Sequence, residues 1–417
     1  MTASFFVEEW QPREFTALSA SRHSALRSPD YNACVMERPF DARLECSACR
    51  ETFGMDRLRN LCDKCKGPLL VRYALRNSPQ LRSVVQQRAP SMWRYFEVLP
   101  ASSPEEIITL GEGATPMLPA RAVGESLGTP ALFIKDESKN PTRSFKSRGM
   151  SAAVTMARSL GATSFAAPTA GNAGCALAAY GARATTPVFV AMPDDTPRSI
   201  VEECRSYGAS VELVRGVITD AARRVQQHVA EHGGFDVSTL KEPYRVEGKK
   251  TMGYELLEDL GRLPDVILYP TGGGTGLIGM WKAFAEMEQL GWIGPQRPRM
   301  IIVQSEGCAP MVRAVRQGLD HAPEWENPST TAWGLRVPRA LGDRLMLAAI
   351  RESNGAAIAV PESEIEPAAQ ELRSKEGIDA GPETGAALVA LRMMLRDRSI
   401  DPDAMIVLFN TGGNKYM

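Results

Sequence analysis

Short apolar runs that alternate with helix-length segments limit what this chain can fold into. From about residue 130, six runs have the composition of buried strands, and they lie at residues 131–135, 163–169, 186–193, 265–270, 299–306 and 404–410. Strands that are rich in Val, Ile and Ala and are separated by helices are typical of parallel sheets covered on both faces. The sequence therefore predicts an α/β fold.

The charge balance argues against several classes of partner. The chain has 48 Lys and Arg residues against 49 Asp and Glu, a formal net charge of -1, so no surplus of cations is available to neutralise a phosphate backbone. No stretch approaches the roughly 20 apolar residues that span a bilayer. The first fifteen residues lack the basic-then-apolar order of a secretory signal. We therefore expect a cytoplasmic protein with neither nucleic-acid nor membrane partners.

Four of the eight cysteines form two closely spaced pairs. Cys46 and Cys49 make one Cys-x2-Cys turn, and Cys62 and Cys65 make a second one, with twelve residues between the two turns. Two such turns present four thiolates to one point, which is the arrangement that zinc takes with four ligands. Because cysteine fills all four positions, no place remains for a reacting water. The sequence predicts a structural zinc site.

The loop after the strand at 131–135 places a lysine at the start of a helix. Residues 140–142 favour a turn, and Ser144 can cap a helix that begins at Phe145. Lys146 then lies in the first turn, where the helix dipole and the nearby Arg148 would both lower its pKa. Such a lysine is a candidate nucleophile, although a surface lysine on a helix is the simpler alternative.

Glycines follow the next apolar run as well. Gly171 and Gly174 allow the backbone to approach a ligand at a helix start, and Asn172 adds an amide that can bond a phenolic or carboxylate oxygen. This pattern favours an anion site. Close packing of the helix would explain the same glycines.

A third loop, after the strand at 265–270, contains Gly272, Gly273 and Gly274 followed by Thr275. Successive backbone amides in such a loop suit a phosphate, but the residues match neither a dinucleotide fingerprint nor a P-loop. An activated lysine and a cradle for one phosphate are together what pyridoxal 5'-phosphate requires. Thr411, after the last strand, could bond the pyridine nitrogen without protonating it, which suits elimination and replacement reactions.

Eight motifs in order resemble the fold-type II pyridoxal-phosphate enzymes and, more narrowly, the threonine synthases. The resemblance covers about residues 85–417, and its blocks lie at residues 93–95, 110–117, 135–149, 168–184, 242–251, 270–279, 381–387 and 410–413. It implies a tryptophan synthase β-like fold with two open twisted sheets that carry helices on both faces. Some members of the family also carry a zinc-ribbon-like segment before this fold.

The resemblance also implies roles for the cofactor residues. Lys146 would form the Schiff base and move protons between substrate carbons, and Asn172 would bond the ring oxygen of the cofactor. The loop from Gly272 to Thr275 would hold its phosphate, and Thr411 would meet the pyridine nitrogen.

Further residues would bind the substrate. The helix start with Thr169, Gly171 and Gly174 would receive its carboxylate. Arg245 would bind the leaving phosphate of O-phosphohomoserine, with Ser144 and Arg148 as additional anion contacts.

The sequence departs from the family pattern at three positions near these motifs. The family usually has Gly in place of Arg143, Asp in place of Ser147 and Asn in place of Glu242, so a changed leaving group or side-chain anion has to be considered. Lys249 and Lys250 are expected to form a solvated charge pair, with a place in the site as the less favoured alternative. For Glu247 and Glu383, a structural polar contact and a functional role are equally good interpretations.

These observations give the following organisation. We expect an arm at residues 1–42, a zinc-ribbon-like module with the four cysteines at 43–72 and a catalytic domain at 73–417, with a smaller lobe at about 145–240. The expected activity converts O-phospho-L-homoserine and water to L-threonine and phosphate. The alternative is β-replacement or β-elimination on O-phosphoserine, serine or threonine, as in cysteate synthase or an ammonia-lyase. The family resemblance makes a homodimer the default assembly.

Two functions from other classes carry less weight. A nicotinamide-dependent oxidoreductase would need a ribose-binding acid about 20 residues after the glycines, and Glu286 and Glu288 come too early and within a helix. A zinc-ribbon module that binds nucleic acid would need a basic face, and acids are interspersed among the basic residues of segment 43–72.

Overall fold

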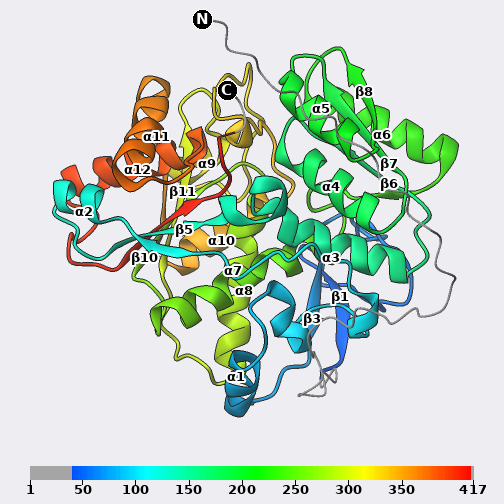
Figure 1. Ribbon diagram of the computed structural model, residues 1–417, viewed down its shortest axis with the longest axis horizontal. Helices are drawn as coiled ribbons and strands as arrows, with labels where there is room; N and C mark the ends of the chain where they lie inside the picture. Colours follow the sequence, from blue (N-terminus) through cyan, green and yellow to red (C-terminus); the bar gives the residue numbers. More distant parts are fainter. Residues whose placement is uncertain (1–39, 415–417) are drawn as a thin grey trace, which may run out of the picture. The chain divides into compact units, whose positions relative to one another are not determined.

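The structure is a computed structural model that describes residues 40–414. The arm expected at residues 1–42 lies almost wholly outside the described residues. Within the described part, the strands form three sheets of six, four and three strands (Figure 1). No helix of residues 40–414 is long and apolar enough to cross a membrane.

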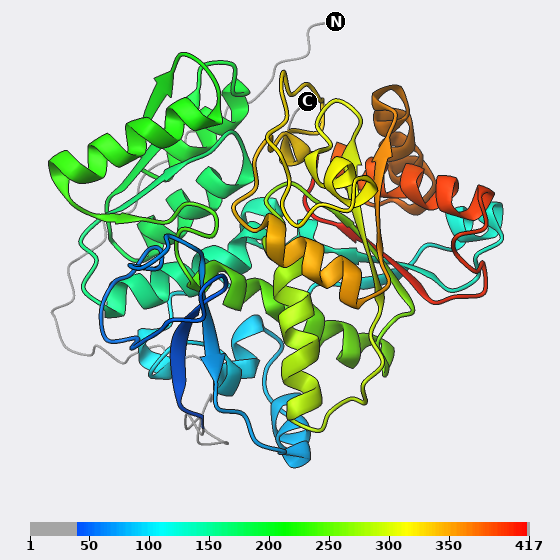
Figure 2. The ribbon, with the colours of Figure 1, turned by 180° about the vertical axis from the view of Figure 1, so that it is seen from behind.

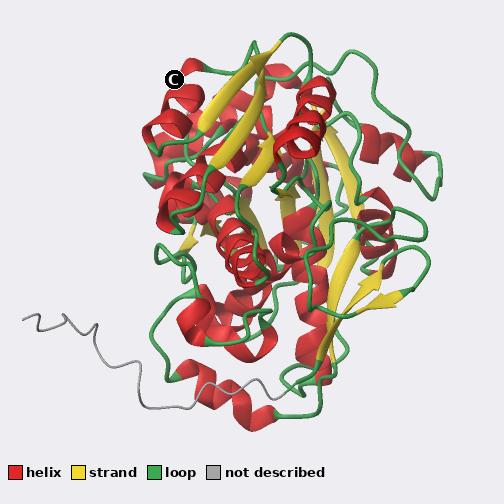
Figure 3. Cartoon of the chain, turned by 90° about the vertical axis from the view of Figure 1, so that its right-hand side faces the viewer, coloured by secondary structure: helices red, strands yellow, loops and turns green. Residues whose placement is uncertain are grey.

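The six-stranded sheet has the order β12-β11-β10-β13-β5-β4 and is parallel except for the edge pair of β4 and β5. Its central strands β10, β11 and β13 are buried because their side chains are mostly apolar on both faces, and helices lie on both sides of the sheet (Figure 3). The bounds are β4 (Met117–Pro119), β5 (Leu132–Asp136), β10 (Val266–Pro270), β11 (Arg299–Ser305), β12 (Ala356–Val360) and β13 (Ile406–Asn410).

Helices from the carboxyl-terminal half cover much of this sheet. Helix α12 packs against β10, β11, β12 and β13, and α10 packs against β11. The bounds are α2 (Arg121–Leu127), α9 (Pro310–Arg316), α10 (Asp343–Glu352), α11 (Glu362–Glu376) and α12 (Pro382–Arg396).

The four-stranded sheet has the order β8-β7-β6-β9 and is parallel throughout. It appears in green in Figure 1 with helices α4, α5 and α6 around it. The bounds are β6 (Phe165–Pro168), α4 (Asn172–Arg183), β7 (Val188–Pro193), α5 (Arg198–Ser206), β8 (Ser210–Val214), α6 (Ile218–His232) and β9 (Phe235–Asp236).

The cysteine-containing segment forms the antiparallel three-stranded sheet. Strands β1 (Ala42–Cys46), β2 (Thr52–Phe53) and β3 (Leu69–Tyr73) pair in the order β2-β1-β3, and α1 (Pro79–Gln86) follows. Figure 2 shows these strands in blue, and β3 contacts α7. Leu44, Leu69 and Val71 belong to the same buried apolar cluster as side chains of the main body. The four-cysteine module therefore shares a core with the rest of the described chain.

Three helices lie side by side near the middle of the molecule: α3 (Lys146–Ser159), α7 (Tyr244–Leu260) and α8 (Thr275–Gln289). Glycines let their backbones approach closely, because a Cβ at Gly248 of α7 would overlap the carbonyl oxygen of Arg148 on α3. On the other side of α7, a Cβ at Gly279 of α8 would lie 2.9 Å from Lys250 N. Helix α7 is thus covered on two sides, and the polar residues in its first half are buried.

The α/β fold and all six expected strands are confirmed by the structure. The sequence analysis did not identify the short strands β4 and β9. It also missed two edge strands, β8 and β12. Both edge strands have partly exposed residues, so they lack the continuous burial that marks the central strands.

Candidate active site

Lys146 is the first residue of α3, and the chain before it is joined to the segment after β13. Phe145 N–H donates to Thr411 O at 3.1 Å, and Ser144 forms an antiparallel bridge with Gly412. Lys146 and Thr411, which the sequence separates widely, are therefore neighbours. The expected helix cap by Ser144 is not formed: its buried Oγ has no hydrogen-bond partner within residues 40–414.

The Lys146 amine is shifted towards its neutral form. Its side chain is only partly exposed, and Nζ lies 3.8 Å from the centre of the Phe145 ring. Burial, and next the positive charge of Arg245, lower the pKa of Lys146 to about 7, while Glu383 has the opposite effect. This direction was expected from the sequence, where the helix dipole and Arg148 were named as its causes. In the structure burial is the largest cause, and the cation that contributes is Arg245 of α7.

Asn172 lies beside this junction. A Cβ at Gly412 would be 3.1 Å from Asn172 Nδ2 and 3.2 Å from Ser144 Cβ, so the three residues surround one small space. Asn172 Oδ1 is buried and has no hydrogen-bond partner among the described residues. The start of α4 therefore brings Asn172 to Lys146 and Thr411.

The loop before α4 is held by Thr169. The amides of Gly171 and Gly174 donate to Thr169 Oγ1 at 3.1 and 3.2 Å, so in this structure they are not free for an anion. A Cβ at Gly174 would also overlap the methyl group of Thr169 and meet Cys204 Sγ at 3.3 Å. Close packing thus requires Gly174, which was the alternative interpretation of this glycine.

The triple-glycine loop joins β10 to α8. Gly274 has a φ of +74°, which favours glycine, and α8 begins at the next residue, Thr275. A Cβ at Gly272 would overlap the carbonyl of Gly334, and a Cβ at Gly273 would lie 3.1 Å from Thr239 Cγ2. The loop is therefore tightly enclosed at the amino terminus of a helix, where backbone amides favour an anion.

Arg245 lies in the first turn of α7 beside this loop. Its Nη1 donates to Val237 O at 2.9 Å and to Thr239 Oγ1 at 3.2 Å, and Thr239 in turn faces Gly273. Its Nε and Nη2 are buried and have no partner within residues 40–414. A guanidinium with two unused donors is suited to bind a phosphate by a fork of hydrogen bonds.

Glu242, one of the three departures from the family pattern, caps α7. Its carboxylate accepts hydrogen bonds from Tyr244 N at 2.7 Å and from Arg245 N at 3.0 Å. Burial raises the pKa of Glu242 to about 7, against the opposing effect of Arg245. Glu242 therefore positions the helix turn that carries Arg245.

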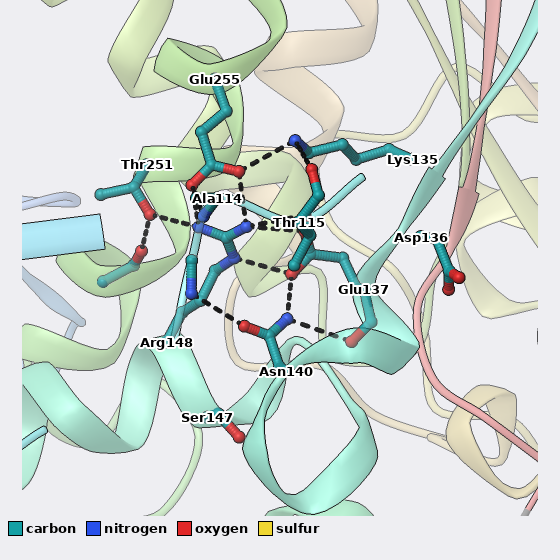
Figure 4. A network of polar contacts seen from close by, with 12 residues as sticks. Ala114, Thr115, Lys135, Asp136, Glu137, Asn140, Ser147, Arg148, Thr251 and Glu255 are labelled. Carbon is teal, nitrogen blue, oxygen red and sulfur yellow. Dashed lines mark hydrogen bonds and ion pairs between the residues drawn. The ribbon is translucent and has the colours of Figure 1, made fainter. Parts of the chain in front are cut away.

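Arg148 requires a correction, because it does not face an anion site. Figure 4 shows it between Glu137 and Glu255, with Nε–Glu137 and Nη1–Glu255 distances of 2.7 and 2.5 Å. Thr115 and Thr251 accept further hydrogen bonds from its nitrogens at 3.0 Å. Its guanidinium is fully buried and all three nitrogens are bonded to protein, so Arg148 is a structural residue.

The two other departures also lie away from an anion pocket. Arg143 has a φ of +55°, which accounts for the family's glycine, and its exposed side chain pairs with Asp379 at 2.6 Å. Ser147 Oγ lies 2.9 Å from Thr142 Oγ1 and donates to Pro141 O. Ser147 therefore closes the turn before the helix.

The expectation of a solvated pair at Lys249 and Lys250 is wrong, since both side chains are fully buried. Lys250 pairs with Glu247 at 2.7 Å and with Glu286 at 2.9 Å. Glu247 also accepts a hydrogen bond from Tyr73 of β3 at 2.9 Å, so this network joins α7 to the four-cysteine module. For Glu247, the structural interpretation is the better one.

Lys249 and Glu383 are residues of the site that the sequence analysis did not assign. Lys249 Nζ donates to Thr275 Oγ1 at 2.6 Å and lies 5.1 Å from the Phe145 ring centre, so it connects the glycine loop with the start of α3. Glu383 accepts a hydrogen bond from Gly334 N at 2.7 Å, and burial raises its pKa. Lys249 therefore lies between the triple-glycine loop and the start of α3, where Lys146 is located.

The four cysteines of the expected metal site are together. Their sulfur atoms all lie within 4.8 Å of one another, with Cys46–Cys65 and Cys49–Cys62 separations of 3.4 and 3.6 Å. Four sulfurs at about 2.3 Å from one zinc ion in a tetrahedron would be ~3.8 Å apart. The geometry of this cluster fits a tetrahedral metal.

The buried polar atoms that lack partners fit the expected cofactor. Ser144 Oγ, Asn172 Oδ1 and Arg245 Nε and Nη2 are such atoms, and a buried polar group without a hydrogen bond is costly in a folded protein. Together with the Lys146 amine and the loop at the start of α8, they provide a nucleophile, an anion cradle and hydrogen-bonding groups. Lys146, Asn172, Thr411 and the glycine loop are the residues that would hold pyridoxal 5'-phosphate.

Comparisons with known proteins agree with the expected cofactor and family. Residues 108–412 match the family model described as pyridoxal-phosphate dependent enzyme. The chain is 34% identical to threonine synthase of Methanosarcina acetivorans and 33% identical to threonine synthase of Methanocaldococcus jannaschii. Each match extends over 371 residues, which are 88% of this chain and 91% of the relative.

Solved structures agree on the fold. Maize serine racemase superposes with a TM-score of 0.62 at 21% identity, over 72% of this chain and 88% of that chain. A threonine deaminase from Solanum lycopersicum superposes with a TM-score of 0.60 at 18% identity, over 82% and 93% of the two chains. At these identities the likeness concerns the fold alone. By its matched family model and its sequence identity, the chain belongs to the pyridoxal-phosphate-dependent enzymes, among the threonine synthases of that family.

Proposed function

We propose that this protein converts O-phospho-L-homoserine and water to L-threonine and phosphate. The observation that carries the proposal is the pair of unpartnered donors on Arg245, buried beside the glycine loop and close enough to Lys146 to lower its pKa. A substrate with a phosphate leaving group supplies the anion that these donors need.

Lys146 is the group that moves protons in this proposal. Bound pyridoxal 5'-phosphate supplies an electron sink that stabilises negative charge on the substrate carbons. With a pKa of about 7, the Lys146 amine can accept a proton and return it near neutral pH. Glu383 and Arg245 act on this pKa in opposite directions, so both adjust the proton affinity of Lys146.

The remaining residues bind and orient. We assign the cofactor's ring oxygen to Asn172, its phosphate to residues 272–275 and its pyridine nitrogen to Thr411. The loop with Thr169, Gly171 and Gly174 is assigned to the substrate carboxylate, for which the two glycine amides must first leave Thr169 Oγ1. Ser144, with its unpartnered Oγ, is assigned to a substrate anion. Arg148 is not among the substrate residues, because Glu137 and Glu255 neutralise it.

The departures from the family pattern no longer argue for another substrate. Arg143 pairs with Asp379 at the surface, Ser147 closes a turn, and Glu242 caps the helix that carries Arg245. The contacts of Arg143 and Ser147 supply no charged group to the substrate, and the Glu242 carboxylate, whose charge acts on Arg245, is bound by two backbone amides. This supports O-phosphohomoserine over the β-replacement and β-elimination alternatives.

We also propose that Cys46, Cys49, Cys62 and Cys65 bind one structural zinc ion. The sulfur separations support a tetrahedral site, and four cysteine ligands leave no position for a reacting water. A cytoplasmic location and a homodimeric assembly complete the proposal.

The decisive experiment offers the purified protein O-phospho-L-homoserine and O-phospho-L-serine side by side. We expect release of phosphate from the first with an equal amount of threonine, and little release from the second. Phosphate release from O-phosphoserine at the higher kcat/KM would replace this proposal with the elimination alternative.

A further inference from the structure

Lys249 is a buried lysine to which the proposed function gives no role. It lies on α7 between α3 and α8, where a Cβ at Gly149 of α3 would come within 2.8 Å of Lys249 Cε. Its Nζ donates to Thr275 Oγ1 at 2.6 Å. Thr275 is the first residue of α8 and directly follows Gly274, so the amine lies beside the end of the glycine loop.

Lys249 has no ion-pair partner among the described residues, although the charge of Glu242 partly opposes the lowering of its pKa. Within residues 40–414, no carboxylate oxygen lies within 4.0 Å of its Nζ, whereas the adjacent Lys250 pairs with both Glu247 and Glu286. Arg245 and Lys146 add positive charge nearby, and burial together with these two cations lowers the pKa of Lys249 well below its usual value. Three basic groups that share a buried region favour an anion among them.

We propose that Lys249 is a cofactor-binding residue whose ammonium group binds the phosphate of pyridoxal 5'-phosphate together with the amides of the glycine loop. This inference rests on the cofactor assignment in the proposed function. A phosphate at the loop would give Lys249 the charge partner that the protein does not provide, and this would restore its protonated form.

The contacts distinguish Lys249 from Arg245. Lys249 bonds directly to Thr275, a residue of the loop itself, whereas Arg245 reaches the loop only through Thr239. We therefore assign Lys249 to the phosphate of the cofactor and Arg245 to the phosphate of the substrate.

The test compares two ligands that differ only in the phosphate. Dissociation constants of pyridoxal 5'-phosphate and of pyridoxal are measured by absorbance and fluorescence on the cofactor-free protein and on K249Q and K249M. The amide of K249Q can keep a hydrogen bond to Thr275 without the charge. We expect both variants to weaken pyridoxal 5'-phosphate by about 10- to 100-fold and to leave pyridoxal nearly unchanged, as for loss of one charge-assisted hydrogen bond.

Lys250→Met is the matched control, because it removes an equally buried lysine at the next position. It should lower thermal stability by leaving Glu247 and Glu286 without this partner, but it should preserve the ratio of the two dissociation constants. An unchanged ratio in both Lys249 variants would overturn the inference. So would a rise in KM for the phosphorylated substrate with unchanged cofactor affinity, because Lys249 would then serve the substrate.

A crystal structure of the wild-type holoenzyme decides the case if neither Lys249 variant folds. A distance of about 3.2 Å or less from Nζ to a phosphate oxygen supports the inference, and a distance beyond about 4 Å contradicts it. The readouts also separate this inference from the proposed activity. If the Lys249 variants lose the preference for pyridoxal 5'-phosphate over pyridoxal in a protein that does not make threonine, Lys249 remains assigned. Equal affinities of the wild type for the two ligands would reject the cofactor assignment itself.

Discussion

Replacement of Arg245 by Met is the most direct test of the proposed leaving-group site. Arg245→Met keeps a flexible side chain of similar length and removes both unpartnered donors, Nε and Nη2. Each hydrogen bond from a charged donor to phosphate contributes about 1.5–3 kcal/mol. Two such bonds correspond to about 3–6 kcal/mol, or a loss of about 10² to 10⁴ in kcat/KM for O-phosphohomoserine.

The same variant should change the pH profile, because Arg245 lowers the pKa of Lys146. Removal of the guanidinium raises that pKa, so a larger fraction of the Lys146 amine is protonated at a given pH. The acid limb of kcat, which reports the enzyme with substrate bound and requires the neutral amine, should move to higher pH. This shift would not follow from a loss of phosphate contacts alone.

The assay measures phosphate release at low and at saturating substrate concentration from pH 5.5 to 9. Arg245→Lys serves as a control that retains the charge without the planar fork, and it should lose less activity than Arg245→Met. The affinity for pyridoxal 5'-phosphate and the melting temperature are measured on the same preparations. A kcat/KM within tenfold of the wild type, or a loss explained entirely by weaker cofactor binding, would refute the assignment.

Three further outcomes follow from other parts of the structure. Because Lys146 has a pKa of about 7, the rate at which cofactor-free protein reacts with pyridoxal 5'-phosphate should rise between pH 6 and 8; a Lys146→Ala control should show no such reaction, and a flat profile in the wild type would contradict the shift. Arg148→Met leaves Glu137 and Glu255 buried without this cation, so urea unfolding should show a loss of about 3–5 kcal/mol; a loss below 1 kcal/mol would argue against the network. Cys62→Ser should reduce zinc content, measured by atomic emission, from one equivalent towards zero and lower the melting temperature; unchanged zinc would place the metal elsewhere.

The sheets could be predicted because their central strands are apolar on both faces. β10 and β13, with sequences VILYP and IVLFN, are fully buried, so every residue contributes to the signal. The edge strand β8 has the sequence SVELV and exposes some residues, which makes it resemble a surface segment. Sequence patterns report burial, so an edge strand carries a weaker pattern than a central one.

The location of charged side chains was the part that sequence could not supply. Arg148 lies two residues after Lys146, and this proximity suggested a shared anion site. Its actual partner Glu255 comes from a distant helix and approaches only because glycines bring α3 and α7 together. A long-range ion pair of this kind leaves no local pattern.

Helix α7 caused the related error at Lys249 and Lys250. A helix with adjacent lysines, acids on either side and no continuous apolar stripe suggests a solvated surface. Here α3 and α8 cover it, and Lys250 is neutralised by Glu247 three residues earlier and by Glu286 on α8. The small residues Gly248 and Gly253 were the available signal, since they permit neighbouring elements to approach an otherwise polar helix.

The backbone hydrogen bonds between the residues before α3 and the residues after β13 have a consequence for synthesis of the chain on the ribosome. During translation the four-stranded sheet, which ends at Asp236, can assemble on the ribosome well before residues 411–413 emerge. Until then Phe145 N–H lacks Thr411 O and Arg143 O lacks Gly413 N–H, so two hydrogen bonds that hold the backbone before Lys146 cannot form. We therefore expect the surroundings of Lys146 to be complete only in a polypeptide translated past Gly413.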